Sequence, residues 1–244
     1  MAEATEPRHI DLNADLGEGF GRWSLTDDDR LLEVVSSANV ACGFHAGDPV
    51  TLRRVCARAA ELDVAVGAQV SFRDLVGFGR RRLECTPAEL AADVLYQLGA
   101  LGAFCAAAGT RVRYVKPHGA LYHELAGDPA RASAVVEAVG AYDPSLAVLC
   151  LPGSALLAAA DEQGLRAVRE AFPDRAYRPD GGLVDRASSG ALITDPADVA
   201  RRAVEMAATV DSLCIHGDSG AALAAATAVR GALEVAGWAV RSFG

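Results

Sequence analysis

Residues 115–124, with the sequence VKPHGALYHE, place a lysine, two histidines and a glutamate close together in a chain otherwise rich in alanine, valine, leucine and arginine. Lys116 is the only lysine of the chain, which also contains 22 arginines. The lysine ammonium is a compact charge that can lose a proton, whereas the guanidinium of arginine stays protonated and presents a planar fork of donors. We therefore expect a chemical role for Lys116, with chance survival of one lysine as the alternative.

Short segments rich in β-branched residues alternate with alanine-rich segments of helical spacing along the chain. The expected strands are residues 9–16, 37–42, 64–70, 112–118, 146–153, 213–219 and 238–244. Four expected helices begin with a capping side chain and a proline, at Asp48-Pro49, Thr86-Pro87, Asp128-Pro129 and Asp195-Pro196, and Glu89 completes a capping box with Thr86. This alternation predicts βαβ units and a mainly parallel sheet in one domain, either closed as a barrel or open and doubly wound.

The residues best suited to chemistry lie at the carboxyl ends of the expected strands. In both parallel architectures this edge carries the loops that build active sites, so we expect one crevice to collect these side chains. The set comprises Asn13, Asp15, Glu18, Asn39, His45, Asp48, Gln69, Lys116, His118, His123, His216 and Asp218.

Two interpretations of the histidines in this set stay open. Imidazole and carboxylate ligands from separate strands can converge on a divalent metal, for which Asp15, His45, His118 and His216 are the candidates. The chain has no HxH or HExxH spacing. The same side chains can instead act as hydrogen-bonding or acid–base groups around an anionic substrate, and we favour this metal-free interpretation.

Composition and motifs exclude several classes of protein. The formal net charge of −9 argues against nucleic acid and anionic membranes as partners, since both attract basic surfaces. The segment GEGFG at 17–21 lacks the third glycine of a dinucleotide fingerprint, and no GxxxxGK[ST] phosphate loop is present. The basic loop GFGRRR at 77–82 contains Arg80 and could clamp a phosphate or carboxylate, although most such runs are solvated.

The cellular setting is also indicated by the sequence. Six cysteines are scattered without a CxxC pair, which favours a reduced cytoplasmic protein. We expect no signal or transit peptide at the amino terminus. The uncharged residues 94–110 are diluted with alanine and glycine, so we expect a buried helix there and no membrane span.

Several motifs together resemble the LamB/YcsF family from about residue 9 to the carboxyl terminus. They are DLNADLGEGFG, ANVACGFHAGDP, GAQVSFRDLVGFGRR, VKPHGALYH, PDGGLVDR followed by GALI, and CIHGDS. The resemblance implies an α/β fold, a distorted seven-stranded TIM-like (β/α) barrel of the glycoside hydrolase/deacetylase type. We expect a single domain over residues 1–244, with residues 1–8 as a flexible tail.

The same resemblance implies an ATP-dependent 5-oxoprolinase, a cyclic-amide hydrolase that acts together with B and C subunits. Such an enzyme converts the small lactam 5-oxo-L-proline, ATP and water to L-glutamate, ADP and phosphate, and we expect Mg²⁺ to accompany the ATP. The alternatives are a metal-dependent deacetylase-like hydrolase and a non-catalytic lactam-binding carrier subunit.

Roles for individual residues are hypotheses at this stage. A resonance-stabilised lactam with a carboxylate needs an anion anchor, an activator of its carbonyl oxygen and a base for water. The candidate catalytic residues are Asp15, Glu18, His45, Lys116, His118 and His216. The candidate substrate-binding residues are Asn13, Asn39, Gln69, Arg80, His123 and Asp218. Asp15, His45 and His118 are the first candidates for metal ligands.

Overall fold

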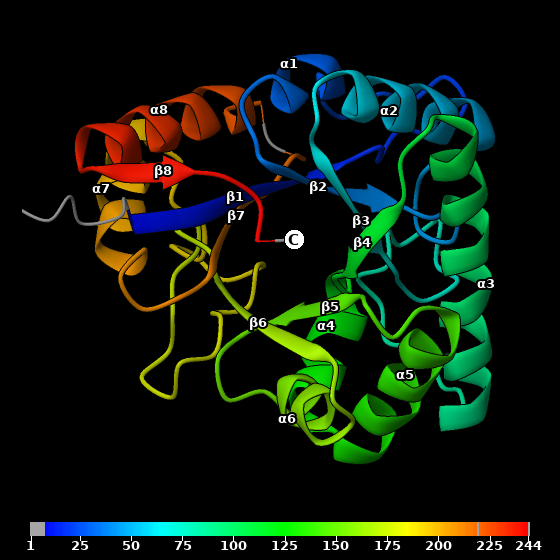
Figure 1. Cartoon of the computed structure of the whole chain (residues 1–244). Coiled ribbons are helices and arrows are strands. Elements are labelled where there is room, and N and C mark those ends of the chain that lie inside the picture. The colour runs from blue at the N-terminus through cyan, green and yellow to red at the C-terminus, as the bar shows by residue number, and fades with distance from the viewer. Residues whose placement is uncertain (1–7, 219, 244) are drawn as a thin grey trace, which may run out of the picture.

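The computed structural model describes residues 8–218 and 220–243, and its centre is a closed barrel of seven parallel strands (Figure 1). In spatial order around the barrel these are β1 (Arg8–Leu16), β2 (Ser37–Ala41), β3 (Ala65–Gln69), β4 (Val112–Val115), β5 (Ala147–Cys150), β6 (Arg166–Ala171) and β7 (Ser212–Ile215). The barrel closes because β1 pairs with β2 on one side and with β7 on the other. The expected seven-stranded TIM-like barrel is confirmed.

Helices surround the barrel (Figure 1). They are α1 (Asp28–Leu32), α2 (Pro49–Glu61), α3 (Pro87–Ala107), α4 (Gly119–Gly127), α5 (Pro129–Tyr142), α6 (Ala155–Glu162), α7 (Pro196–Met206) and α8 (Ala222–Val235). All four predicted cap-and-proline starts are confirmed, at α2, α3, α5 and α7. At α3 the Thr86 side chain accepts from the Glu89 amide, and the Glu89 side chain accepts from the Thr86 amide, which forms the predicted capping box.

The strand prediction was wrong about which segments form the barrel. β6 was not predicted, because three of its six residues are charged. The carboxyl-terminal segment that was counted as a barrel strand contains β8 (Trp238–Val240), which pairs only with Arg8–Ile10 of β1 among the described residues. Arg8 already belongs to β1, so the expected tail ends one residue too late, and residues 1–7 lie outside the described residues.

The polar and apolar residues of β1 alternate because successive side chains of a strand face opposite sides. Leu12, Ala14 and Leu16 are buried in the main apolar core, which also includes residues of the surrounding helices. Asp11, Asn13 and Asp15 therefore point into the barrel, where hydrogen bonds satisfy them. Asp11 accepts from the hydroxyl of Ser37, 2.6 Å away.

A glycine makes room for the largest side chain inside the barrel. A Cβ atom on Gly67 of β3 would lie 2.1 Å from the ring of Tyr114 on the neighbouring strand β4. Tyr114 is fully buried and packs against Phe243, with ring centroids 5.2 Å apart. The glycine therefore allows an aromatic side chain to fill the barrel.

We predict that Gly67→Ala destabilises the protein by about 1–3 kcal/mol, because the extra methyl group overpacks the barrel against Tyr114. Gly99→Ala is the matched control, because a Cβ on this exposed position of α3 would meet nothing within 4 Å. Alanine at Gly99 should stabilise the helix by about 0.5–1 kcal/mol. Urea unfolding of both variants measures the two changes, and equal effects of the same sign would contradict this account of Gly67.

The long helix α3 is apolar enough to cross a membrane by length and composition alone, which is a weak indication because core helices pass the same test. In the structure Leu90, Val94 and Leu98 of α3 are buried in the core, and the helix packs against α5. The expected helix is therefore found, but it is buried along one face only, since Leu95 and Tyr96 are exposed. This arrangement is compatible with a soluble protein.

Candidate active site

A cavity of about 1070 Å³ lies at the carboxyl ends of the strands. Six of the predicted site residues line it: Asp15, Arg80, Lys116, His118, His123 and His216. The other predicted residues adjoin it or lie deeper in the barrel. The expected convergence on one edge is therefore found, although not every predicted side chain reaches the cavity.

The ammonium group of Lys116 forms a buried ion pair at this cavity. Its Nζ atom donates to Asp15 Oδ1 at 2.8 Å, and only 3% of the lysine side chain is exposed. Burial acts to lower the pKa of Lys116, but the Asp15 carboxylate raises it well above the ordinary value. Burial likewise acts to raise the pKa of Asp15, but the charge of Lys116 holds it well below the ordinary value. Both groups are therefore ionised near neutral pH.

Asn39 and Asn13 hold Asp15 from inside the barrel. The Asn39 amide donates to Asp15 Oδ1 at 2.9 Å and to Asn13 Oδ1 at 2.6 Å. Tyr114 donates its hydroxyl to Asn39 Oδ1 at 2.7 Å. Asn13 and Asn39 are fully buried and do not line the cavity, so the substrate-binding role predicted for them does not fit this geometry. We interpret both as residues that position Asp15.

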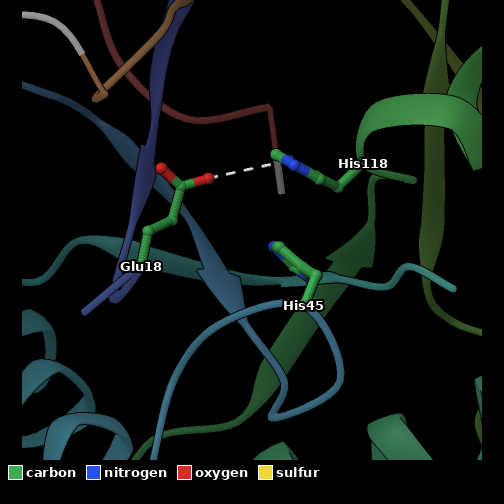
Figure 2. Close-up of side chains that lie close together, drawn as sticks. All are labelled: Glu18, His45 and His118. Atoms are coloured by element: carbon green, nitrogen blue, oxygen red, sulfur yellow. Dashed lines mark ion pairs between the residues drawn. The ribbon is translucent and has the colours of Figure 1, made fainter. Parts of the chain in front are cut away.

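Glu18, His45 and His118 form a second buried cluster beside the ion pair (Figure 2). The amide of Gln69 connects all three: its Nε2 lies 3.0 Å from Glu18 Oε1 and 2.9 Å from His118 Nδ1, and its Oε1 lies 3.2 Å from His45 Nε2. Gln69 is fully buried and does not line the cavity, so we interpret it as a residue that holds this cluster together.

Hydrogen bonds assign the tautomer of His118. Its Nε2 lies 3.0 Å from the carbonyl oxygen of Phe78, which can only accept, so Nε2 carries a proton. Nδ1 then keeps its lone pair and accepts from Gln69. Burial lowers the pKa of His118 to about 3, so its imidazole is neutral near pH 7. His118 is therefore a weak base that orients its neighbours by hydrogen bonds.

The charge states of the other two cluster members follow from the same burial. Burial, followed by the neighbouring imidazole of His118, lowers the pKa of His45 well below the ordinary value. Burial and the charge of Asp15 raise the pKa of Glu18 well above its ordinary value, which suits Glu18 to hold and deliver a proton. Glu18 Oε2 and His45 Nδ1 are buried and have no hydrogen-bond partner.

The cluster differs in one member from the predicted set of metal ligands, which stays a prediction. Donor atoms of Glu18, His45 and His118 lie within 4.8 Å of one another, so Glu18 stands where Asp15 was expected. One imidazole nitrogen of His118 is anchored to a backbone carbonyl, as in many metal-binding histidines. The two imidazole rings are stacked with centroids 4.1 Å apart and planes 15° apart. Lone pairs in nearly parallel planes do not converge on one ion, so binding a divalent cation requires at least one ring to turn.

The low pKa of His118 predicts a loss of stability in acid. The unfolded chain takes up a proton on this histidine below its ordinary pKa of about 6.5, whereas the folded chain does so only near 3. Above the unfolded-state pKa this histidine therefore leaves the free energy of unfolding unchanged. Between pH 6.5 and pH 3 it lowers that free energy by about 1.4 kcal/mol for each unit by which the pH decreases. Urea unfolding at pH 7.5 and pH 5.5 should show a smaller decrease for His118→Gln than for the wild type. Equal decreases would contradict the neutral buried imidazole.

His216 is held by an aspartate that sequence patterns did not indicate. Asp174 lies 2.9 Å from His216 Nδ1 and accepts from the His216 backbone amide at 3.0 Å. Burial acts to raise the pKa of Asp174, but the neighbouring imidazole and backbone amide of His216 lower it. His216 also stacks on Phe172, with ring centroids 5.2 Å apart. Because Asp174 occupies Nδ1, Nε2 is the ring nitrogen available to a ligand.

Asp218 bridges two arginines and does not line the cavity, so the structure gives it no direct contact with a substrate there. It pairs with Arg80 and accepts from Arg186 Nη2 at 2.7 Å. The two arginines do line the cavity. We interpret Asp218 as the residue that positions them.

Glu170 of β6 is a further buried acid that was not predicted. Its Oε2 lies 3.9 Å from Lys116 Nζ, and burial raises its pKa. It is fully buried, and neither carboxylate oxygen has a hydrogen-bond partner. Sequence patterns gave little indication of this acid, because three of the six residues of β6 are charged and the strand itself was not recognised.

A closed parallel barrel with a polar cavity at the carboxyl ends of its strands is the architecture of TIM-like barrel enzymes. Residues 10–244 match the LamB/YcsF family. The chain belongs to this family, which confirms the resemblance seen in its motifs.

Relatives and solved structures agree with this assignment. Over 248 aligned residues the chain is 58% identical to the A subunit of 5-oxoprolinase from Streptomyces avermitilis, and the match covers 96% of this chain and 99% of that relative. The crystal structure of the lactam utilization protein from Thermus thermophilus is 46% identical, with a TM-score of 0.90 over 96% of this chain and 100% of the other. The catalytic domain of a peptidoglycan N-acetylglucosamine deacetylase from Eubacterium rectale, 10% identical, covers 98% and 89% with a TM-score of 0.54 and shows likeness of fold alone.

Proposed function

We propose that the chain is the A component of an ATP-dependent 5-oxoprolinase, which cleaves 5-oxo-L-proline to L-glutamate while ATP is hydrolysed to ADP and phosphate. Relatives that carry the name of the 5-oxoprolinase A component support this function and suggest partner subunits. The observation that carries the proposal is the buried ion pair of Lys116 and Asp15 at the cavity, with Nζ and Oδ1 2.8 Å apart. It presents a fixed cation where negative charge would develop on a lactam oxygen.

In the proposed reaction the terminal phosphoryl group of ATP passes to the lactam carbonyl oxygen. Water then adds to the ring carbon and the ring nitrogen departs as the amine, which gives the acyl phosphate of glutamate. A second water attacks the same carbon, the bond from carbon to the former carbonyl oxygen breaks, and this oxygen leaves with phosphate. Lys116 stabilises the negative charge on the transferring group, as a preorganised donor does. Asp15 keeps this ammonium charged and in place. Mg²⁺ would accompany the nucleotide and neutralise part of its charge.

Proton transfer in this scheme uses His216, which lines the cavity, and Glu18, which does not line it but belongs to the buried cluster that contacts the cavity through His118. His216, oriented by Asp174 through Nδ1, presents Nε2 as a base toward the attacking water. Glu18, whose pKa is raised by burial, is suited to protonate the departing nitrogen. Among the predicted substrate-binding residues, Arg80 and His123 line the cavity, and Arg80 is the candidate for holding the lactam carboxylate.

A metal-dependent hydrolase of the deacetylase type is the second candidate, and the cluster of Glu18, His45 and His118 is the observation that favours it. This activity would need a bound divalent cation and no ATP. Elemental analysis of the purified chain, with hydrolysis of N-acetylated substrates measured in the absence of nucleotide, separates it from the proposed function. A third outcome, lactam binding without turnover in any mixture, would indicate a carrier subunit.

The proposed function is tested by the products formed in a mixture of the chain, its B and C partners, 5-oxoproline, ATP and Mg²⁺. Glutamate and ADP should appear together in equal amounts, and omission of either substrate should stop the coupled reaction. Glutamate formed without ATP would contradict the proposal. We further propose a cytoplasmic location, where 5-oxoproline and ATP are both available.

A further inference from the structure

The cavity is more basic than the rest of the molecule. Six lysine or arginine side chains and four aspartate or glutamate side chains line it, whereas the whole chain has a formal net charge of −9. Three of the basic side chains, Arg175, Arg178 and Arg186, come from the irregular segment 172–195 between β6 and α7. The proposed roles of Lys116, Asp15 and the histidines leave these three arginines without a function.

Arg175 differs from the other cavity arginines because it is buried without a counterion. Only 3% of the residue is exposed. Its Nη2 donates to the carbonyl oxygen of Val184 at 2.7 Å, and its Nε has no partner. In the described part of the chain it forms no ion pair, while Arg80 and Arg186 both pair with Asp218. A buried cation of this kind is costly unless an anion compensates it.

His123 and Arg178 line the same cavity as Arg175. Arg178 donates to the carbonyl oxygen of Leu183 at 3.0 Å, and both side chains of its ion pair with Asp180 are more than half exposed. Two guanidinium groups and an imidazole thus line the cavity, and among the described residues only Arg178 of the three forms an ion pair with a carboxylate. The pKa of His123 is lowered by burial and by the charges of Arg175 and Arg178, in agreement with a basic lining.

We propose that Arg175, with Arg178 and His123, forms a subsite for a phosphate dianion within this cavity. The guanidinium fork matches the oxygen geometry of phosphate. Arg175 forms no ion pair among the described residues, and both partners in the ion pair of Arg178 with Asp180 are solvent-exposed, so these two guanidinium groups are the cavity charges least compensated by carboxylates. This inference rests on the proposed function, in which the phosphate belongs either to the nucleotide or to the phosphorylated lactam.

Titration calorimetry of the purified full-length chain tests the subsite, with inorganic phosphate as the probe. The variants are Arg175→Gln, Arg178→Gln and, as a matched control, Arg53→Gln, which removes an exposed charge of α2 that does not line the cavity. We expect Arg175→Gln to weaken phosphate binding at least about tenfold, a change of about 1.4 kcal/mol. Arg178→Gln should weaken binding less, and Arg53→Gln should leave it unchanged.

Melting temperatures show whether Arg175→Gln has lost its fold, and Arg178→Gln keeps the test decisive in that case because its side chain is largely exposed. Absence of phosphate binding by the wild type, or equal binding by the wild type and a folded Arg175→Gln, would overturn the subsite. A loss of 5-oxoproline binding with phosphate binding intact would also overturn it, because the arginine would then hold the lactam carboxylate.

A non-hydrolysable ATP analogue distinguishes the two sources of the phosphate. Binding of the analogue that depends on Arg175 supports the subsite and assigns it to the nucleotide. Binding of inorganic phosphate alone supports the subsite and assigns it to the phosphorylated lactam or the released product. None of these titrations requires turnover or partner subunits. The subsite and the proposed function can fail separately. If phosphate binding depends on Arg175 but the chain forms no glutamate with its partners, the subsite is supported and the proposed function is contradicted.

Discussion

Lys116→Arg should lower kcat/KM for ATP-dependent glutamate formation at least about a hundredfold, while the protein stays folded. A hundredfold loss corresponds to about 2.7 kcal/mol of transition-state stabilisation, a reasonable contribution for one positioned donor. The substitution keeps the positive charge. It changes the volume and donor geometry of a side chain that is 3% exposed and lies 2.8 Å from Asp15. Charge alone should therefore not restore activity.

The control for this prediction is Arg53→Lys, which makes the reverse exchange at an exposed position outside the cavity. Its kcat/KM should equal that of the wild type. Circular dichroism and thermal melting establish that Lys116→Arg is folded, and Lys116→Met provides an uncharged side chain of similar length if it is not. Near-normal turnover by a folded Lys116→Arg would mean that the single lysine of the sequence was retained by chance.

The second large effect concerns the partner subunits. The chain alone should convert 5-oxoproline negligibly, and glutamate should appear only when both B and C components are present. The described part of the chain has a wide cavity and the sequence has no Walker-type phosphate loop. A partner segment at the mouth would complete the site and exclude water until the lactam is activated.

Glutamate and ADP are measured in parallel for the chain alone, each pair of components and the full mixture. Heat-denatured chain added to B and C is the control for contaminating activity. Full turnover by the isolated chain would contradict the partner requirement. ADP formation by a pair without glutamate would show that the nucleotide site lies outside this chain or is uncoupled from it.

The sequence predicted those parts of the fold that depend on local signals. Four helix starts carried a capping residue and a proline, and each begins a helix in the structure. β6 lacked such a signal, because Arg166 and Arg169 face solvent and Glu170 faces Lys116. A short strand with this composition is stabilised by pairing with β5 and β7, which sequence patterns do not report.

The sequence indicated at which end of the barrel the site lies, but not how deep each site residue lies along the barrel axis. Asp15 and Lys116 were expected to lie at the same edge of the barrel. In the structure they are close enough to form an ion pair. Asn13 lies one step deeper than Asp15 on β1, and Asn39 lies in register with Asp15 on β2 and donates to both; neither asparagine lines the cavity. Asp174 and Arg175 belong to an irregular segment placed by tertiary contacts, so neither spacing nor periodicity indicated that they reach the site.

The fate of the lactam oxygen tests the central claim, that ATP activates 5-oxoproline at its carbonyl oxygen. The complete mixture is supplied with 5-oxoproline that carries ¹⁸O in the ring carbonyl, and the phosphate and glutamate are analysed by mass spectrometry. We predict that the label appears in inorganic phosphate, because the second water attacks the carbon of the acyl phosphate and the original oxygen leaves with the phosphoryl group. Label that remains entirely in the side-chain carboxylate of glutamate, with unlabelled phosphate, would contradict it.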